Sequence, residues 1–243
     1  RGEQILKTDQ DNALLLRDGF EFAGLDDVAR AFAAALDAFG YPPCPGGIML
    51  TTPLWRQPLG AFRESLRQWL YGHDPEGPMN LAIFFDAAAV AGDEALLKAA
   101  RDHLDSIAAG HDPYLARFAA AADQFSEGGG LWQRLTTKRD DQPLDLKKLG
   151  TFPIVHGVRA LSLQYAVREQ GTAARLKQLQ EQGRIDETLA RDLLDALHFL
   201  MGLRLSHQLR QRAGGARPGN EVRPSELGAL EREPLHDALA IVK

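Results

Sequence analysis

The spacing of apolar positions changes character partway along the chain. In the first part, short apolar runs of strand length, each bordered by glycine or aspartate, lie at Asn12–Leu16, Ile48–Thr51 and Asn80–Phe85. Between them, Val28–Phe39 and Phe62–Leu70 repeat their apolar residues at helical spacing. Strands and helices that alternate at these lengths predict a small sheet domain.

Beyond about residue 94 the pattern becomes almost entirely helical. A 3.6-residue periodicity runs through Glu94–Ala109, Pro113–Phe125, Ile154–Arg168, Ala173–Glu181 and Glu187–Gln211. A last helix is expected from Pro224 to Val242, with Pro234 as a kink or break. We therefore predict an α+β sheet domain in residues 1–110, followed by an all-α helical bundle domain in residues 111–243.

Composition and charge narrow the class of protein. A hydrophobic fraction of 44% and a charged fraction of 25% are ordinary for a globular chain, and the net charge of −5 argues against a nucleic-acid partner. The single cysteine, Cys44, excludes an internal disulfide and suits a reducing compartment. No apolar stretch approaches the roughly 18 residues of a membrane helix. The N-terminus also lacks the pattern of a signal peptide, so we expect a cytoplasmic protein without a membrane partner.

Three carboxylates are the leading candidates for chemistry. Asp9 and Asp11 are two residues apart at the edge of the first predicted strand, so both side chains are expected on one face. Asp86 directly follows the third predicted strand and could reach the same edge. Hard oxygen ligands without clustered cysteine or histidine suit Mg²⁺ or Mn²⁺. The alternative is that all three are ordinary turn or capping residues.

The sequence around these carboxylates resembles a known family. Arg1–Leu14 is similar to the signature of nucleotidyltransferases related to the uridylyltransferase of nitrogen regulation, and the resemblance continues through Trp55–Trp69 and Ile83–Asp86. In the second half, Asp145–Lys148 and His207–Gln208 are among the motifs that resemble the family's companion C-terminal domain. The similarity covers essentially the whole chain.

The resemblance implies a fold and a set of metal ligands. The fold is that of DNA polymerase β, and Asp9, Asp11 and Asp86 bind Mg²⁺ and a nucleoside triphosphate. An acceptor then attacks the α-phosphorus and pyrophosphate leaves. In bacteria such modules accompany cyclic-nucleotide-binding and CBS domains in signal-transduction proteins, so upstream regulatory domains are expected in a longer chain.

Further nucleotide-binding positions accompany these carboxylates. The resemblance places Arg1, Lys7 and Thr8 at the nucleotide, and in the family a Gly-Ser pair lies just before the position of Arg1. In the helical half, Lys147 and Lys148 follow an acidic loop and could contact the triphosphate as point charges. The alternative for these two lysines is a solvated surface.

These observations predict transfer of NMP from an NTP to a hydroxyl of a protein or small molecule. Asp86 is expected to hold the catalytic metal and to help deprotonate the acceptor, for which a regulatory protein is a candidate. The alternative is a nucleotide-sensing or interaction module that keeps the fold without activity. It is favoured by Ala87–Ala89, where the family has an arginine near position 88. A glycosyltransferase using Asp-x-Asp is a weaker third interpretation.

Overall fold

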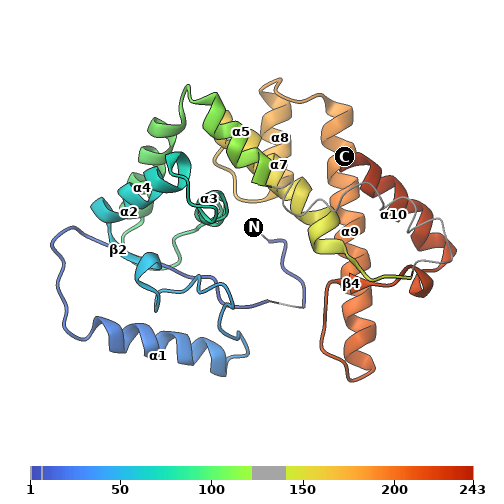
Figure 1. The fold of residues 1–243 in the computed structure, drawn as a ribbon, viewed down its shortest axis with the longest axis horizontal. Coiled ribbons are helices and arrows are strands. Elements are labelled where there is room, and N and C mark those ends of the chain that lie inside the picture. Colours follow the sequence, from blue (N-terminus) through green and yellow to red (C-terminus); the bar gives the residue numbers. More distant parts are fainter. Residues whose placement is uncertain (1, 7, 122–140, 243) are drawn as a thin grey trace. The chain divides into compact units, whose positions relative to one another are not determined.

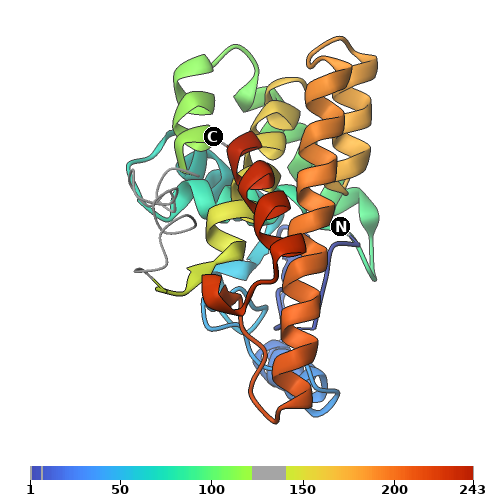
Figure 2. The ribbon, with the colours of Figure 1, turned by 90° about the vertical axis from the view of Figure 1, so that its right-hand side faces the viewer.

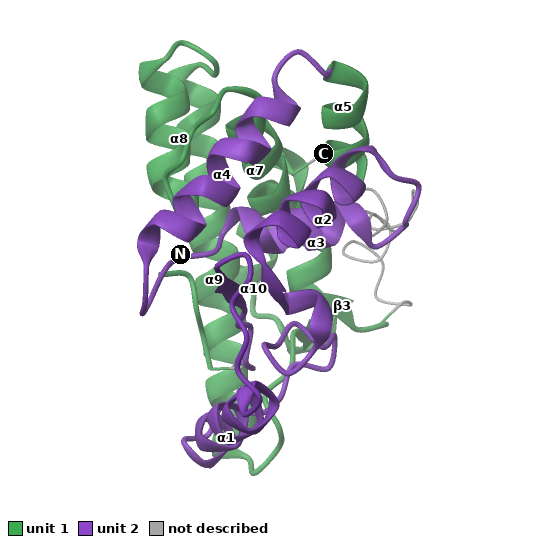
Figure 3. Cartoon of the chain, turned by 90° about the vertical axis from the view of Figure 1, so that its left-hand side faces the viewer, with its two compact units in different colours: residues 1–7, 112–243 green, residues 8–111 purple. Residues whose placement is uncertain are grey.

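The computed structural model describes residues 2–6, 8–121 and 141–242. The chain forms two compact units, shown in green and purple in Figure 3. Unit 2 comprises residues 8–111, and unit 1 comprises residues 112–243 together with residues 1–7. The change from unit 2 to unit 1 therefore falls between His111 and Asp112.

A two-stranded parallel sheet lies in unit 2. Strand β1 (Leu14–Leu16) pairs with β2 (Arg56–Pro58), which follows a short 3₁₀ helix, η1 (Pro53–Trp55). The prediction of a strand at Ile48–Thr51 is wrong, because this segment forms hydrogen-bonded turns. The N–H of Met49 donates to the carbonyl oxygen of Gly47 at 2.8 Å, and a further turn bond links residues 52 and 49.

Four helices complete unit 2. They are α1 (Leu25–Ala38), α2 (Leu59–Tyr71), α3 (Gly77–Phe85) and α4 (Glu94–Ala108), labelled in Figure 1. The buried face of α2 carries Phe62, whose ring meets the rings of Trp69 and Phe84 edge-on at centroid distances of 5.6 and 5.1 Å. Edge-on packing is a favoured arrangement of aromatic rings. These rings join α2 to α3 in the core.

Helix α3 replaces the strand predicted at Asn80–Phe85, and that prediction is wrong. A short, continuous apolar run fits a buried helix as well as a buried strand. Here Gly77 and Pro78 begin the helix, and proline is favoured in a first helical turn because its missing N–H is not needed there. Leu81 and Ala82 are then fully buried. The run is apolar because it lies in the helical core.

Unit 1 is a set of packed helices. They are α5 (Asp112–Ala120), α7 (Phe152–Gln164), α8 (Thr172–Glu181), α9 (Glu187–Ala213) and α10 (Ala229–Ile241), with a π-helical turn, η3 (Lys147–Thr151), before α7. Helix α10 lies along α9 (Figure 2), and Leu197, Leu200 and Leu203 of α9 belong to the buried cluster that joins the two helices. Part of the helix predicted at Pro113–Phe125 lies outside the described residues.

Two details of unit 1 differ from the sequence prediction. A short antiparallel pair, β3 (Leu144–Asp145) with β4 (Glu221–Val222), lies where strands were not expected. The predicted last helix is divided into a 3₁₀ turn, η4 (Pro224–Glu226), and α10, which continues through Pro234 without a break. The predicted fold class, a small α+β unit followed by a helical unit, is nevertheless confirmed. None of the helices described here is long and apolar enough to cross a bilayer.

Candidate functional site

The Asp-x-Asp segment is fixed to unit 2 by the residue between the aspartates. Gln10 is buried, with 3% of its surface exposed. Its side-chain amide donates to the carbonyl oxygens of Ala33 and Tyr41 at 3.0 and 2.8 Å. Its backbone N–H donates to the carbonyl oxygen of Pro42 at 2.9 Å. Gln10 therefore ties this segment to α1 and to the chain that follows it.

Asn12 adds a second attachment two residues further on. Its backbone N–H donates to the carbonyl oxygen of Ile48 at 3.0 Å, and its side-chain oxygen accepts from the N–H of Leu50 at 2.9 Å. Gln10 and Asn12 thus face the protein, whereas Asp9 and Asp11 are exposed. Side chains alternate in direction along an extended chain, so the two aspartates lie on the same, solvent-facing side.

The Asp11 carboxylate also influences the cysteine. Burial raises the pKa of the Cys44 thiol, and the hydrogen bond and negative charge of Asp11 raise this pKa further. The thiol therefore stays protonated beside the carboxylate and donates to it. This contact places Asp11 next to the turn at Cys44–Gly47, where the N–H of Gly47 donates to the Cys44 carbonyl oxygen at 3.0 Å.

Asp86 occupies a different kind of position. It is the half-buried residue that ends α3, and its N–H donates to the carbonyl oxygen of Ile83 at 3.2 Å. It does not end a strand, so the argument that brought it to the edge beside Asp9 and Asp11 fails. Across the described residues, three or more histidine, cysteine, aspartate or glutamate side chains nowhere gather as a metal-binding group.

The carboxylates of Asp9 and Asp11 can be compared with the ligands that a divalent cation prefers. Mg²⁺ commonly keeps several water ligands and binds proteins through one or two carboxylates together with substrate phosphates. The exposed pair of Asp9 and Asp11 fits that chemistry, because it offers hard oxygen donors on one accessible side. A site that also needs Asp86 as a third ligand is not assembled in the part of the chain described.

An arginine that the sequence did not suggest contacts the residue that follows Asp86. The guanidinium of Arg101, on α4, donates to the carbonyl oxygen of Ala87. The family resemblance implies an arginine near position 88. In the structure, the arginine that contacts this segment is Arg101, 14 residues after Ala87. A usable signal was present, because Arg101 shares the helical face of Leu97 and the buried Leu104.

The predicted nucleotide-binding positions are distributed over both units. Arg1 and Lys7 lie outside the described residues, and the half-buried Thr8 opens unit 2. Lys147 and Lys148 are exposed in unit 1, at the π-helical turn, where their backbone N–H groups donate to the carboxylate of Asp145 at 2.9 and 3.0 Å. That carboxylate fixes the turn and leaves both ammonium groups in solvent.

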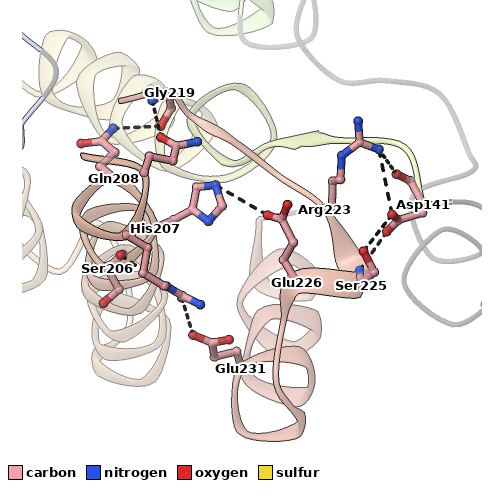
Figure 4. Close-up of polar contacts among 11 residues, drawn as sticks. Asp141, Ser206, His207, Gln208, Gly219, Arg223, Ser225, Glu226 and Glu231 are labelled. Atoms are coloured by element: carbon pink, nitrogen blue, oxygen red, sulfur yellow. Dashed lines mark hydrogen bonds and ion pairs between the residues drawn. The ribbon is translucent and has the colours of Figure 1, made fainter. Parts of the chain in front are cut away.

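The motif His207–Gln208 has a structural role in α9 (Figure 4). Gln208 is fully buried and donates to the carbonyl oxygen of Gly219 at 3.1 Å, which holds the segment that follows the helix. His207 is nearly buried, and its Nε2 lies 3.8 Å from the carboxylate of Glu226 in η4. Both contacts fasten the chain between α9 and α10.

The chain thus holds a small α+β unit that carries the Asp-x-Asp segment, followed along the chain by a helical unit. Family comparison agrees: residues 1–76 match a family described as "Putative nucleotidyltransferase", and residues 112–243 match "Putative nucleotidyltransferase substrate binding domain". The second match spans more than half of the chain, which therefore belongs to this family, and the resemblance in its motifs is confirmed. No curated protein matches the chain.

Proposed function

We propose that this protein is a metal-dependent nucleotidyltransferase that transfers NMP from an NTP to a hydroxyl group in a signal-transduction pathway. The observation that carries the proposal is the exposed pair of Asp9 and Asp11. The hydrogen bonds of Gln10 and Asn12 fix this segment to unit 2. A fixed pair of carboxylates on an accessible side suits a Mg²⁺-bound or Mn²⁺-bound triphosphate. Family membership supports the same reaction class.

The proposed reaction is a single displacement. The acceptor oxygen bonds to the α-phosphorus, the bond from that phosphorus to pyrophosphate breaks, and the hydroxyl proton passes to a carboxylate or to water. Bound Mg²⁺ would neutralise charge on the phosphates. Asp9 and Asp11 would hold the nucleotide complex. Asp86, whose neighbour Ala87 accepts from the Arg101 guanidinium, remains our candidate for the carboxylate near the acceptor.

The remaining assignments are proposals of the same kind. Arg1, Lys7 and Thr8 would contact the nucleotide close to the aspartates, and Lys147 and Lys148 would add positive charge from unit 1. The acceptor is a protein, for example a regulatory protein, or a small molecule. A cytoplasmic location and regulatory domains upstream in a longer chain complete the proposal.

A binding experiment tests the nucleotide site. We expect Mg²⁺ and an NTP together to raise the thermal unfolding temperature, because a ligand at 100 times its Kd adds about 2.7 kcal/mol to the stability of the folded state. Each NTP should be measured with Mg²⁺, with Mn²⁺ and with EDTA. The double variant Asp9→Asn, Asp11→Asn should lose the shift. If no NTP shifts the wild-type transition with either metal, the nucleotide-site proposal is wrong.

Two observations favour a second candidate, a nucleotide-sensing module without transfer activity. A two-metal reaction needs a third ligand, whereas the described residues do not bring Asp86 together with the Asp9–Asp11 pair as a group of three. Ala87–Ala89 also lacks the arginine of the family signature. A sensor would show the same thermal shift, so binding alone does not separate the two functions, and turnover must be measured.

A further inference from the structure

A carboxylate from the start of the chain completes the N-terminus of α8. This helix begins after Gly171, which has no side chain and so cannot cap the helix itself. The first N–H groups of a helix lack acceptors within the helix. Here the N–H of Thr172 donates to Oε1 of Glu3 at 2.7 Å, across 169 positions of sequence. Glu3 thus serves as the capping side chain of α8.

The surroundings of this cap favour a negative charge. Thr172 is fully buried and Glu3 is half-buried, so the N–H would be costly to leave without an acceptor. The first turn of α8 contains no acidic residue of its own, although anions are favourable at the positive end of a helix. Arg175, three residues after Thr172 on the same side of the helix, adds a positive charge that is only 1% exposed. A carboxylate therefore suits this end of α8 better than a neutral group.

Glu3 also lies in the segment that leads to the Asp-x-Asp pair. Residues 1–7 belong to unit 1, and the chain then enters unit 2 at Thr8 and reaches Asp9. The described residues 2–6 form neither helix nor strand. Ordering such a segment costs conformational entropy at each residue. A contact that orders it before a ligand binds lowers the free-energy cost of binding.

We propose that Glu3 is a positioning residue for the nucleotide site. By capping α8, it anchors the segment that contains Arg1 and Lys7 and that continues into Thr8. The helical unit thereby contributes to nucleotide binding through its hold on this segment. Glu3 acts through these neighbours and not by contact with the nucleotide. The inference rests on the proposed function, which assigns the three neighbours to the nucleotide.

Amide measurements by NMR on the full chain, without nucleotide, test the anchor. Glu3→Ala removes the acceptor of the Thr172 N–H, so hydrogen exchange at this amide should become at least about tenfold faster. The heteronuclear NOE of the Ile5 amide should fall, because the segment gains motion on the nanosecond timescale. The amide of Leu200, in the middle of α9, should exchange as in wild type. Glu3→Gln keeps a side-chain oxygen and should recover part of the protection.

Nucleotide binding tests the positioning role. With Mg²⁺ and the NTP that stabilises wild type most, Glu3→Ala should raise the Kd and the KM for NTP about tenfold while kcat changes little. An interaction that is equally strong in the ground and transition states affects KM alone. Glu3→Gln should lie between Glu3→Ala and wild type. Glu181→Ala is the matched control, because it removes an exposed carboxylate from the other end of α8, and it should bind like wild type.

Each way of failing has its own result. Unchanged exchange at Thr172 in Glu3→Ala overturns the anchor. Faster exchange together with wild-type NTP affinity overturns the positioning role, because Glu3 would then only stabilise α8. A wild-type chain that binds no NTP refutes the proposed function and with it the nucleotide role of Glu3. In that case the exchange measurement still decides whether Glu3 anchors the segment, so the two failures are distinguishable.

Discussion

Replacing Asp11 by asparagine is expected to lower NMP transfer by about a thousandfold and to weaken NTP binding as well. The change removes one negative charge from the proposed metal-binding pair, and a loss of about 4 kcal/mol in charge stabilisation corresponds to that factor. The fold should persist because Asp11 is exposed, and the asparagine oxygen can still accept from the Cys44 thiol. Both effects are measured by titration with Mg²⁺ and NTP and by pyrophosphate release.

Two matched variants make this result specific. Asp37→Asn changes an exposed carboxylate of α1 in the same unit, and it should bind and transfer like wild type. Asp86→Asn should reduce transfer by a similar factor while NTP binding changes much less, if Asp86 serves the acceptor. Transfer at the wild-type rate by Asp11→Asn would remove Asp11 from the site, and the same result for Asp86→Asn would remove Asp86.

Replacing Phe62 by alanine is expected to destabilise unit 2 by about 3–5 kcal/mol, the cost of deleting a fully buried aromatic ring. Phe62 is 1% exposed and meets the rings of both Trp69 and Phe84, so its loss opens a cavity between α2 and α3. That amount is a large part of the 5–15 kcal/mol that typically stabilises a domain. The measurement is the midpoint of urea unfolding, followed by tryptophan fluorescence.

The control for this variant is Val90→Ala, which also shortens an apolar side chain but at a position that is 94% exposed. It should change the midpoint very little, because an exposed methyl group contributes little to burial. If the free energy of unfolding of Phe62→Ala lies within about 1 kcal/mol of the wild-type value, the rings of α2 and α3 do not form the core of unit 2.

Helical periodicity carried most of the fold prediction. Long amphipathic segments such as α4 and α9 are specified by many residues, and both were predicted with the N-terminal residue that the structure shows. Each begins after an aspartate whose carboxylate accepts a backbone N–H, Asp93 for α4 and Asp186 for α9. Such capping signals are local and therefore readable from sequence.

Short elements were less predictable because their pairing is not local. Strand β2 is the polar tripeptide Arg56–Pro58, which carries no strand pattern and exists because β1 lies next to it. The apolar run at Asn80–Phe85 lacked a period that would separate helix from strand. Because this run was assigned to a strand, Asp86 was predicted at a sheet edge. In the structure, Asp86 ends helix α3.

At the candidate site, the local part was predictable and the long-range part was not. The spacing of Asp9 and Asp11 predicted one shared face, and the buried Gln10 and Asn12 contacts agree with that expectation. Helical spacing places Arg101 on the core-facing side of α4, but its approach to Ala87 depends on how α4 packs in unit 2, which spacing does not give. The roles of all these residues in binding and transfer stay predictions.

The measurement that tests the central proposal most directly is pyrophosphate release by the wild-type chain. The protein should be incubated with each α-³²P-labelled NTP, Mg²⁺ or Mn²⁺, and a cell extract as the source of acceptors. We predict pyrophosphate release matched by label on a protein or small molecule, with both signals lost in the double variant Asp9→Asn, Asp11→Asn. NTP binding without any pyrophosphate release would contradict the transferase function and favour the nucleotide sensor.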